Sequence, residues 1–440
     1  MKTSPLIFAA ALAVLNSCNT TPTTEKKSAT TLDVVSLKKA TPEEADALVA
    51  KFIEAKEGST IEIPSGYFEM TTQLILDKVN NVTIKGKGMY ESVISFKTIK
   101  SGGEGMKIAG NNALLQDFTV MDAPGDCIKT QHCDGLTFRN INTTWTHSDL
   151  SKSGTYGIYP VQCKNVVVDK CEVSNSRDAG IYVGQSENIV VKDCYVHENV
   201  AGIEIENSDN AEVFNNRAEN NTAGILVFNL PGLPKAAGSK TKVYKNTIKS
   251  NNHVNFAVPL TPSATATVAA GQNGNAVTMV PPGSGIIILA GSEVEIFDNV
   301  ISDHKTVGII IASYQFTGLP IPNHPGWSPY TSNISIHDND LQRPAASMPD
   351  TTKDGGKLIA NFCQATQDIV YDGVFDAKKG KDITKNPMNI CINEKKGDLK
   401  FTRFSLPPDG NMAKMQVSND LKFFNTCSVA VNTDVKTLLK

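Results

Sequence analysis

The chain has 440 residues, a formal net charge of −3, and 40% hydrophobic and 20% charged residues, a balance typical of a soluble globular protein. This charge does not provide the basic surface that nucleic acid requires, so nucleic acid is not expected as a partner. The 37 asparagines exclude an all-helical protein, because asparagine competes with the hydrogen bonds of a helical backbone.

The first eighteen residues have the layout of an export signal. Lys2 is positive, residues 6–15 are apolar, and Leu15-Asn16-Ser17-Cys18 places a small residue before a cysteine. This tetrad resembles a bacterial lipobox, in which the cysteine is lipidated and becomes the mature N-terminus. We therefore expect residues 1–18 to be a lipoprotein signal peptide and Cys18 to carry the lipid anchor. Ordinary signal cleavage is the alternative.

Residues 19–40 contain many Thr and Lys residues without apolar periodicity, which predicts a flexible tether. Together with the signal, the tether predicts an exported bacterial lipoprotein of the outer membrane that faces the periplasm or the cell surface. Its membrane contact would be the anchor at Cys18.

Residues 41–58 predict an amphipathic helix. Thr41-Pro42-Glu43-Glu44 is a capping box with proline at the first helical position, and Gly58 is the expected stop. Apolar residues follow the box at helical spacing: Ala45, Leu48, Val49, Phe52 and Ile53. Such a helix can cover the exposed end of the repeat structure that follows it.

A repeat of 22 or 23 residues runs through the middle of the chain. Each repeat contains a short apolar strand that begins with a glycine, and a second strand opens eight residues after the first three of these glycines. The glycines are Gly157, Gly180, Gly202, Gly224, Gly285 and Gly308. Short strands at a constant period, separated by Gly and Asn, predict a solenoid in which every turn is one rung.

The alternation within the glycine-led strands separates two faces of the solenoid. Ile158, Ile181, Ile203 and Ile225 share the face that we expect to form the core. The positions between them form an outward column with rungs about 4.8 Å apart. This column is predicted to contain Lys129, Tyr159, Tyr182, Glu204, Leu226, Ile287 and Ile310.

An inward column is rich in asparagine. Stacked amides can bond to one another and to the backbone of adjacent rungs. The later rungs place Asn216, Asn246, Asn299 and Asn339 in this column, and the earlier rungs place Phe118, Ile141, Cys171 and Cys194 there. We therefore expect these two cysteines to be buried core residues rather than redox or metal groups.

Residues 346–440 lose the repeat, and we expect either a distal cap or a small appended domain after a β-helix over residues 41–345. Cys363, Cys391 and Cys427 lie in this part, where an oxidising compartment would permit one disulfide of undetermined pairing. No two cysteines have C-x-x-C spacing, so nothing supports a zinc or thioredoxin site.

The capping helix, the asparagine column and strings such as Asp178-Ala-Gly-Ile-Tyr-Val-Gly-Gln-Ser and Gly224-Ile-Leu-Val-Phe-Asn resemble a family of exported bacterial right-handed parallel β-helix repeat proteins in the pectin-lyase-like superfamily. The resemblance covers roughly residues 41–345. It implies an all-β fold, a right-handed parallel β-helix with an N-terminal capping helix. The family has no settled activity, its members often accompany an exported cytochrome-like protein, and relatives elsewhere in the superfamily act on polysaccharides.

Four insertions interrupt the rungs beside the glycine-led strands. Residues 142–155 and 254–283 precede such a strand, and residues 230–240 and 315–332 follow one. Long connections in a solenoid commonly gather on the functional face. We therefore expect two walls along a groove whose floor is the outward column.

This groove contains the groups that uronate chemistry needs. Arg177 or Lys129 would neutralise the sugar carboxylate, His147 or Tyr182 would remove the adjacent proton, and Tyr159 would protonate the leaving oxygen. Elimination and C5 epimerisation share that first step. The candidate substrate-binding residues are Trp145, Asp149, Tyr156, Asp178, Glu204 and Glu206.

A glycosidase is an alternative, with Glu204 and either Asp178 or Asp149 as its two carboxyl groups. Plain structural roles stay open as well: Tyr159 and Tyr182 as stacked sheet residues, Arg177 and Asp178 as a turn ion pair, and His147 as a solvated loop residue. Asp126-Cys-Ile-Lys has a faint similarity to the acidic strand of pectin hydrolases, but the second aspartate and a later Gly-His-Gly are absent.

The predicted function is therefore that of an exported carbohydrate-active protein, a lyase or C5 epimerase acting on a polysaccharide that contains uronate. A non-catalytic carbohydrate-binding or scaffold protein that works with an exported, cytochrome-like partner is the alternative, because no complete catalytic motif is present and Leu226, Ile287 and Ile310 make one end of the groove apolar. Metal delivery has less support, since no dense Met, His or Cys cluster lies outside the core. No cofactor or bound metal is expected.

Overall fold

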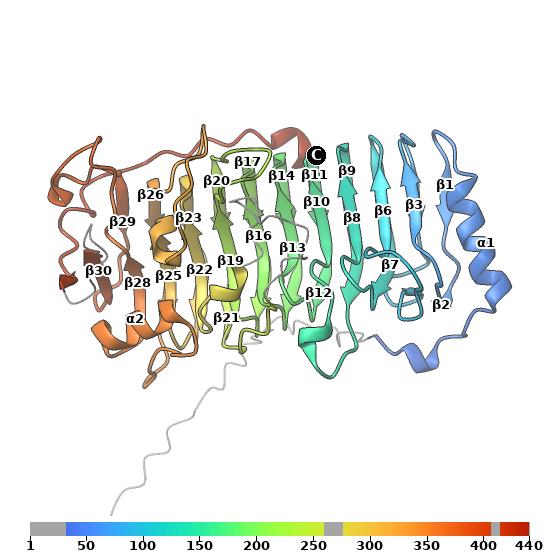
Figure 1. The fold of residues 1–440 in the computed structure, drawn as a ribbon, viewed down its shortest axis with the longest axis horizontal. Helices are drawn as coiled ribbons and strands as arrows, with labels where there is room; N and C mark the ends of the chain where they lie inside the picture. The colour runs from blue at the N-terminus through green and yellow to red at the C-terminus, as the bar shows by residue number, and fades with distance from the viewer. Residues whose placement is uncertain (1–31, 259–275, 406–413, 440) are drawn as a thin grey trace, which may run out of the picture. The chain divides into compact units, whose positions relative to one another are not determined.

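The computed structural model describes residues 32–258, 276–405 and 414–439, and an α-helix lies near the start of the first range. Helix α1 (Pro42–Ile53) has the predicted capping box, in which the Glu44 amide donates to Thr41 Oγ1 over 3.2 Å and the Thr41 amide donates to Glu44 Oε2 over 2.8 Å. Ala45, Leu48 and Phe52 are buried, and α1 lies across the end of the stacked strands (Figure 1). The helix therefore caps the core, as predicted.

Two details of the predicted helix are wrong. Helix α1 ends at Ile53 instead of continuing to Gly58, and the side chain of Ile53 is 77% exposed. Ile53 follows Phe52 directly, so it lies about 100° further around the helix and outside the stripe that faces the core.

Most rungs have three strands, and one strand of each rung, glycine-led in the clear repeats, belongs to a twelve-stranded sheet, here called the groove sheet. Its strands are β3 (Leu74–Asp77), β6 (Met106–Ala109), β8 (Ile128–Gln131), β10 (Ile158–Val161), β13 (Ala179–Gly184), β16 (Ala201–Glu206), β19 (Ala223–Phe228), β22 (Ser284–Leu289), β25 (Val307–Ala312), β28 (Gln367–Tyr371), β30 (Phe401–Ser405) and β31 (Gln416–Ser418). All its pairings are parallel except that of β30 with β31.

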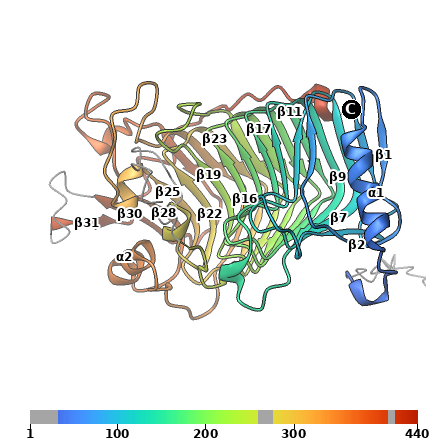
Figure 2. The same cartoon turned by 45° about the vertical axis from the view of Figure 1, so that its right-hand side comes forward.

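The remaining strands of the rungs form a nineteen-stranded sheet, here called the back sheet. Its strands are β1 (Thr60–Glu62), β2 (Gly66–Glu69), β4 (Thr83–Lys85), β5 (Ser92–Ser95), β7 (Ala113–Met121), β9 (Asp134–Thr144), β11 (Lys164–Asp169), β12 (Glu172–Ser174), β14 (Glu187–Lys192), β15 (Tyr195–His197), β17 (Asp209–Phe214), β18 (Arg217–Glu219), β20 (Thr241–Tyr244), β21 (Thr247–Lys249), β23 (Ser292–Phe297), β24 (Val300–Ser302), β26 (Ser332–His337), β27 (Asp340–Gln342) and β29 (Ile390–Asn393). Figure 2 shows the strands of successive rungs lying side by side.

The short helical segments all lie between strands or at the ends of the described chain. They are η1 (Val34–Ser36), η2 (Leu150–Lys152), η3 (Val277–Met279), η4 (Tyr314–Thr317), α2 (Asp354–Cys363), η5 (Ile383–Lys385) and η7 (Lys436–Leu439). None of the helices in the described ranges is long and apolar enough to cross a membrane.

The register of the groove sheet confirms the predicted core face. Ile158 pairs with Ile181, Ile181 with Ile203, and Ile203 with Ile225. All four side chains are completely buried in the main core. Stacking identical branched side chains at the strand spacing fills the interior in the same way on every rung.

The predicted asparagine column is a continuous hydrogen-bonded ladder. Asn216 Nδ2 donates to Asn246 Oδ1 over 3.0 Å, and Asn246 Nδ2 donates to Asn299 Oδ1 over 2.9 Å. The Cys194 amide donates to Asn216 Oδ1, and the Cys171 amide donates to Cys194 Sγ. Both cysteines are buried free thiols in this ladder, as predicted.

A second ladder was not predicted. Asn199 donates to Asn221 and Asn221 donates to Asn251 through their side-chain amides, over 3.0 and 2.8 Å. The ladder ends at His304, whose Nδ1 accepts from the Asn251 amide while Nε2 lies 3.2 Å from the Ile248 carbonyl oxygen. Burial lowers the pKa of His304 to about 4, which keeps the ring neutral.

Residues 346–440 are not a separate unit. Strands β28 and β30 extend the groove sheet beyond β25, and β29 extends the back sheet beyond β26. One disulfide lies in this part, as predicted, and it joins Cys391 to Cys427. The repeat is not visible in the sequence here because α2 and longer turns separate the strands.

The end of the chain returns to the middle rungs along the back sheet. The Asp434 amide donates to Asn210 Oδ1 over 2.7 Å, and Asn210 Nδ2 donates to the Asp434 carbonyl over 3.1 Å. Val435 is buried against Val167 and Val190, and the C-terminal segment lies beside β11 in both views (Figures 1 and 2).

Candidate functional site

The predicted outward column is present in the groove sheet. Lys129 pairs with Tyr159 and Tyr182 pairs with Glu204, while the pairing of Ile158 with Ile181 places the two tyrosines on adjacent rungs. Glu206 is the next outward residue on β16, two positions after Glu204. The register prediction on which the site rested is therefore confirmed.

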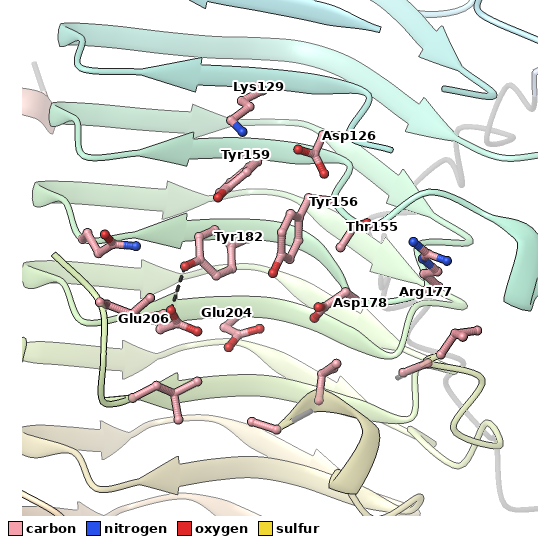
Figure 3. A pocket seen from close by; sticks show the side chains of 17 residues that line it. Asp126, Lys129, Thr155, Tyr156, Tyr159, Arg177, Asp178, Tyr182, Glu204 and Glu206 are labelled. Carbon is pink, nitrogen blue, oxygen red and sulfur yellow. Dashed lines mark hydrogen bonds between the residues drawn. The ribbon is translucent and has the colours of Figure 1, made fainter. Parts of the chain in front are cut away.

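A cavity of about 350 Å³ opens over this part of the column (Figure 3). We call it the carboxylate pocket, because four carboxyl groups, two cations and three tyrosines line it. These polar residues are Asp126, Lys129, Tyr156, Tyr159, Arg177, Asp178, Tyr182, Glu204 and Glu206, and the lining is completed by Thr155, Gln185, Leu230, Leu233, Ala257, Val258, Ala276 and Val277.

The inserted loops form walls over the groove sheet. Leu230 and Leu233 come from the loop after β19, while Ala276 and Val277 come from the loop before β22. These loops pack on the outer face of the sheet as a second apolar cluster. Consequently Leu226 and Ile310 are at most 1% exposed, so the expectation of an open groove along the whole column is wrong for its later rungs.

Three tyrosine rings form the centre of the pocket. The ring centroid of Tyr156 lies 4.6 Å from those of Tyr159 and Tyr182, and the last two are 5.0 Å apart. Burial raises the pKa of all three hydroxyls, and nearby carboxylates raise it further. These hydroxyls therefore stay protonated and act as hydrogen-bond donors.

Lys129 marks the N-terminal edge of the pocket. Its Nζ lies 5.1 Å from the ring centroid of Tyr159 and 3.5 Å from Glu104 Oε1. Glu104 comes from the loop before β6, and Gln73 holds it by donating to its carboxylate over 2.9 Å. This arrangement fixes the ammonium group beside the tyrosines.

Two glutamates on β16 form an unequal pair of acids on the pocket floor. The Tyr182 hydroxyl donates to Glu206 Oε1 over 2.8 Å. Burial raises the pKa of Glu204 well above its ordinary value, and the charges of Glu206 and Asp178 raise it further. Burial also raises the pKa of Glu206, but hydrogen bonds from Tyr182 and Glu204 oppose that rise. The hydrogen bond from Tyr182 therefore stabilises the ionised form of Glu206, whereas the neighbouring charges disfavour ionisation of Glu204.

Asp126 and Asp178 face the pocket from the turns before β8 and β13. Burial raises the pKa of Asp126 to about 7, against the effect of the Lys129 charge. Burial and the charge of Glu206 raise the pKa of Asp178, against a hydrogen bond from Tyr156. Near neutral pH the pocket therefore contains protonated and ionised carboxyl groups together, a feature of acid–base sites.

Trp145 is a core residue, so its predicted place in the substrate site is wrong. Its side chain is 1% exposed, and its Nε1 donates to the Ala123 carbonyl over 2.6 Å. Gly154 makes room for the indole, because a Cβ atom at that position would lie 2.7 Å from Trp145 Cζ2. The loop therefore places its tryptophan inside the solenoid.

His147 and Asp149 are also outside the carboxylate pocket. Neither residue lines it. Asp149 instead caps the turn η2, where its carboxylate accepts from the Ser151 amide over 3.2 Å and from the Ser151 hydroxyl over 2.6 Å. His147, the predicted histidine base, is therefore not part of the pocket, and neither is Asp149, one of the two alternatives for the second glycosidase carboxyl group.

The other predicted site residues come together at the pocket: Lys129, Tyr156, Tyr159, Arg177, Asp178, Tyr182, Glu204 and Glu206. Asp126 was not predicted as a site residue, although it stands directly before the strand that contains Lys129. Glu104 and Gln185 were also missed: Glu104 lies in a turn before the clear repeats, and Gln185 was treated only as part of the string Asp178-Ala-Gly-Ile-Tyr-Val-Gly-Gln-Ser. Among the described residues, no three His, Cys, Asp or Glu side chains are placed to hold a metal ion.

Comparisons with known proteins agree with this architecture. The model of the family described as right handed beta helix region matches residues 140–324. The fold of the chain is thus a right-handed parallel β-helix, as predicted. No curated protein matches the sequence.

Solved structures with similar folds share little sequence with this chain. The catalytic domain of Agl-KA is 17% identical, with a TM-score of 0.44 over 74% of this chain and 47% of that one, so this chain spans about half its length. The A-module of the mannuronan C-5 epimerase AlgE4 of Azotobacter vinelandii is 14% identical, with a TM-score of 0.39 over 75% and 88% of the two chains. Polygalacturonase from Erwinia carotovora ssp. carotovora is 11% identical, with a TM-score of 0.45 over 70% and 92%.

Proposed function

We propose that the protein is a carbohydrate-active enzyme that cleaves a glycosidic bond in the carboxylate pocket. The observation that carries this proposal is the pair of outward, buried glutamates on β16, of which Glu206 accepts a hydrogen bond from the Tyr182 hydroxyl. Glycoside hydrolysis needs two carboxyl groups, one protonated and one ionised. We therefore place the glycosidase alternative ahead of uronate elimination.

The two acids have different roles in this proposal. Glu204, whose pKa is raised furthest by burial and by neighbouring charges, protonates the oxygen of the leaving group. Glu206, held by the Tyr182 hydroxyl, acts in its ionised form and either activates water or stabilises the developing positive charge on the sugar. Asp178 is the remaining candidate for the second carboxyl group, since Asp149 lies elsewhere.

The lining of the pocket also suits a sugar ring. Tyrosine rings offer apolar faces to the C–H groups of a sugar, while their hydroxyls and Gln185 offer hydrogen bonds.

Uronate elimination or C5 epimerisation is the second candidate, and Arg177 favours it. In the part of the chain that the structure describes, this guanidinium makes no ion pair, so it is available to bind a sugar carboxylate. The base is the weaker part of this candidate. His147 lies outside the pocket, and burial raises the pKa of Tyr182 and keeps it protonated.

A panel of purified polysaccharides separates these candidates. Release of reducing ends without ultraviolet absorbance supports glycosidic hydrolysis, whereas an unsaturated uronate product or a changed C5 configuration supports the second candidate. Binding without any product, together with co-purification of an exported partner, would favour the scaffold alternative. The control is the Glu204→Gln variant, which should bind the same glycan without converting it.

We also propose that the protein is exported and anchored through a lipid on Cys18, a residue outside the described ranges. The disulfide between Cys391 and Cys427 supports an oxidising compartment. Bacteria fed labelled palmitate should label the wild-type protein in the outer-membrane fraction and leave the Cys18→Ser variant unlabelled. An unlabelled wild-type protein would contradict the anchor.

A further inference from the structure

A second cavity, of about 260 Å³, lies over the later rungs of the groove sheet. We call it the apolar pocket. Phe228, Ile287, Leu289 and Ile310 form its floor, and Val280, Pro281 and Phe316 form its sides. Its polar residues include Thr352, Lys353 and Asp354, which lie just before and at the start of α2.

The apolar pocket follows the carboxylate pocket along the same outward face. Glu206 pairs with Phe228 and Glu204 pairs with Leu226, so the floor changes from acidic to apolar within one rung, about 4.8 Å. Leu226 then pairs with Ile287, and Ile287 pairs with Ile310. The two cavities are therefore adjacent at Glu206 and Phe228, while Leu226 beside them is buried under the loops and lines neither cavity.

The two cavities also share a wall. Ala276 lines both of them, Val277 lines the carboxylate pocket, and residues 279–281 line the apolar pocket. The turn η3 places these residues in sequence over the boundary between the two floors. The two cavities therefore lie on either side of Ala276.

We propose that the apolar pocket binds an alkyl or aryl aglycone of the sugar whose glycosidic bond lies over Glu204 and Glu206. This inference rests on the proposed glycosidase function and names its substrate class: a glycoside or glycolipid with an apolar group on the leaving side. A dry cavity of about 150 Å³ with a similar lining accommodates benzene. A cavity of 260 Å³ therefore has room for a substituted ring or a medium alkyl chain.

The position of the aglycone agrees with the assigned chemistry. In hydrolysis, the proton passes from Glu204 to the glycosidic oxygen, and the bond between this oxygen and the sugar carbon breaks. Water supplies the hydroxyl group to the sugar and gives its remaining proton to the carboxylate of Glu206, so the pair of acids keeps one proton in total. The products are the free sugar and an alcohol or phenol. The alcohol leaves toward Phe228 and Ile287, where its apolar part is already bound.

Calorimetric titration of the full chain with methyl, butyl and octyl β-glucoside, below their micelle concentrations, tests this inference. Each buried methylene should tighten binding by roughly three- to fourfold, so octyl glucoside should bind at least tenfold more tightly than methyl glucoside. Free octanol serves as a further probe, and it should bind more weakly than octyl glucoside.

The Phe316→Ala variant should remove most of the dependence on chain length, because it removes one apolar side of the pocket. Phe423→Ala is the matched control, since Phe423 is equally half-buried but packs against the main core. Equal affinity or no binding across the glucoside series overturns the inference, even if the glycan panel shows hydrolysis. Octanol binding as tight as that of octyl glucoside overturns it as well. Failure of the glycan panel alone would instead contradict the proposed hydrolysis.

Discussion

The inward side chains of the groove sheet are nearly identical from rung to rung, whereas its outward side chains differ in chemistry. Inward, each rung repeats the same branched residue, so Ile158, Ile181 and Ile203 are interchangeable parts of one core. Outward, four successive strands present Lys129, Tyr159, Tyr182 and Glu204, so the chemical group changes from an amine to phenols to a carboxyl group. The repeat specifies the scaffold, and the departures from it specify the site.

The largest effect should come from changing the outward acids. We expect Glu204→Gln and Glu206→Gln each to lower kcat/KM on the substrate found in the panel by about 10³-fold, because each removes one partner in proton transfer. The melting temperature should stay close to that of the wild type. Glu219→Gln, on the back sheet, is the matched control and should keep full activity. Activity within tenfold of the wild type in both site variants would contradict the assignment.

The next effect concerns the inward ladder. Asn246→Leu should lower the free energy of unfolding by about 3–5 kcal/mol, since it leaves the Asn216 amides and the Val213 carbonyl without their partners. Urea unfolding measures this loss. Cys194→Asn is the informative companion, because the column already contains asparagine on the next rung, and it should cost less than about 1 kcal/mol. Similar losses for both variants would show that ladder positions are not interchangeable.

His304 should make the inward side sensitive to acid. Its pKa is about 4 in the folded chain, below its ordinary value of 6.5, so the stability from the neutral ring is complete above pH 6.5 and is lost as the pH falls toward 4. The loss amounts to about 3 kcal/mol. His304→Asn should remove this part of the acid sensitivity, measured by urea unfolding at pH 7 and pH 4. His132→Asn, at an exposed position, is the control. An unchanged pH dependence of stability in His304→Asn would contradict the role assigned to His304.

The smallest effect should come from the hydrogen bond between the Tyr182 hydroxyl and Glu206. Tyr182→Phe removes the donor to Glu206, so the pKa of Glu206 should rise and the acidic limb of the pH–rate profile should move to higher pH by roughly 0.5–1 unit. Tyr195→Phe, on the back sheet, should leave the profile unchanged. A shift to lower pH in Tyr182→Phe would contradict the role assigned to Glu206.

The sequence was sufficient to predict the β-helix, the capping helix and the outward column, because all three depend on local periodicity. It was insufficient for the insertions, whose packing depends on contacts between distant segments. Trp145 therefore turned out to be a core residue, and Leu226 and Ile310 are covered rather than open. The ladder from Asn199 to His304 was missed because an insertion breaks its spacing and a histidine replaces the last asparagine.

The return of the chain from its last rungs to Asn210 changes how the stack can come apart. In a solenoid whose coils contact only their neighbours, unravelling can begin at either end and proceed coil by coil. Here Asp434 and Val435 contact rungs that precede them by more than 200 residues in the sequence. The last rungs therefore cannot separate from the stack until these contacts break. We therefore expect pulling from the C-terminus in an optical trap to give one abrupt release before any stepwise lengthening. Gradual lengthening from the start would show that the contacts of Asp434 and Val435 bear no force.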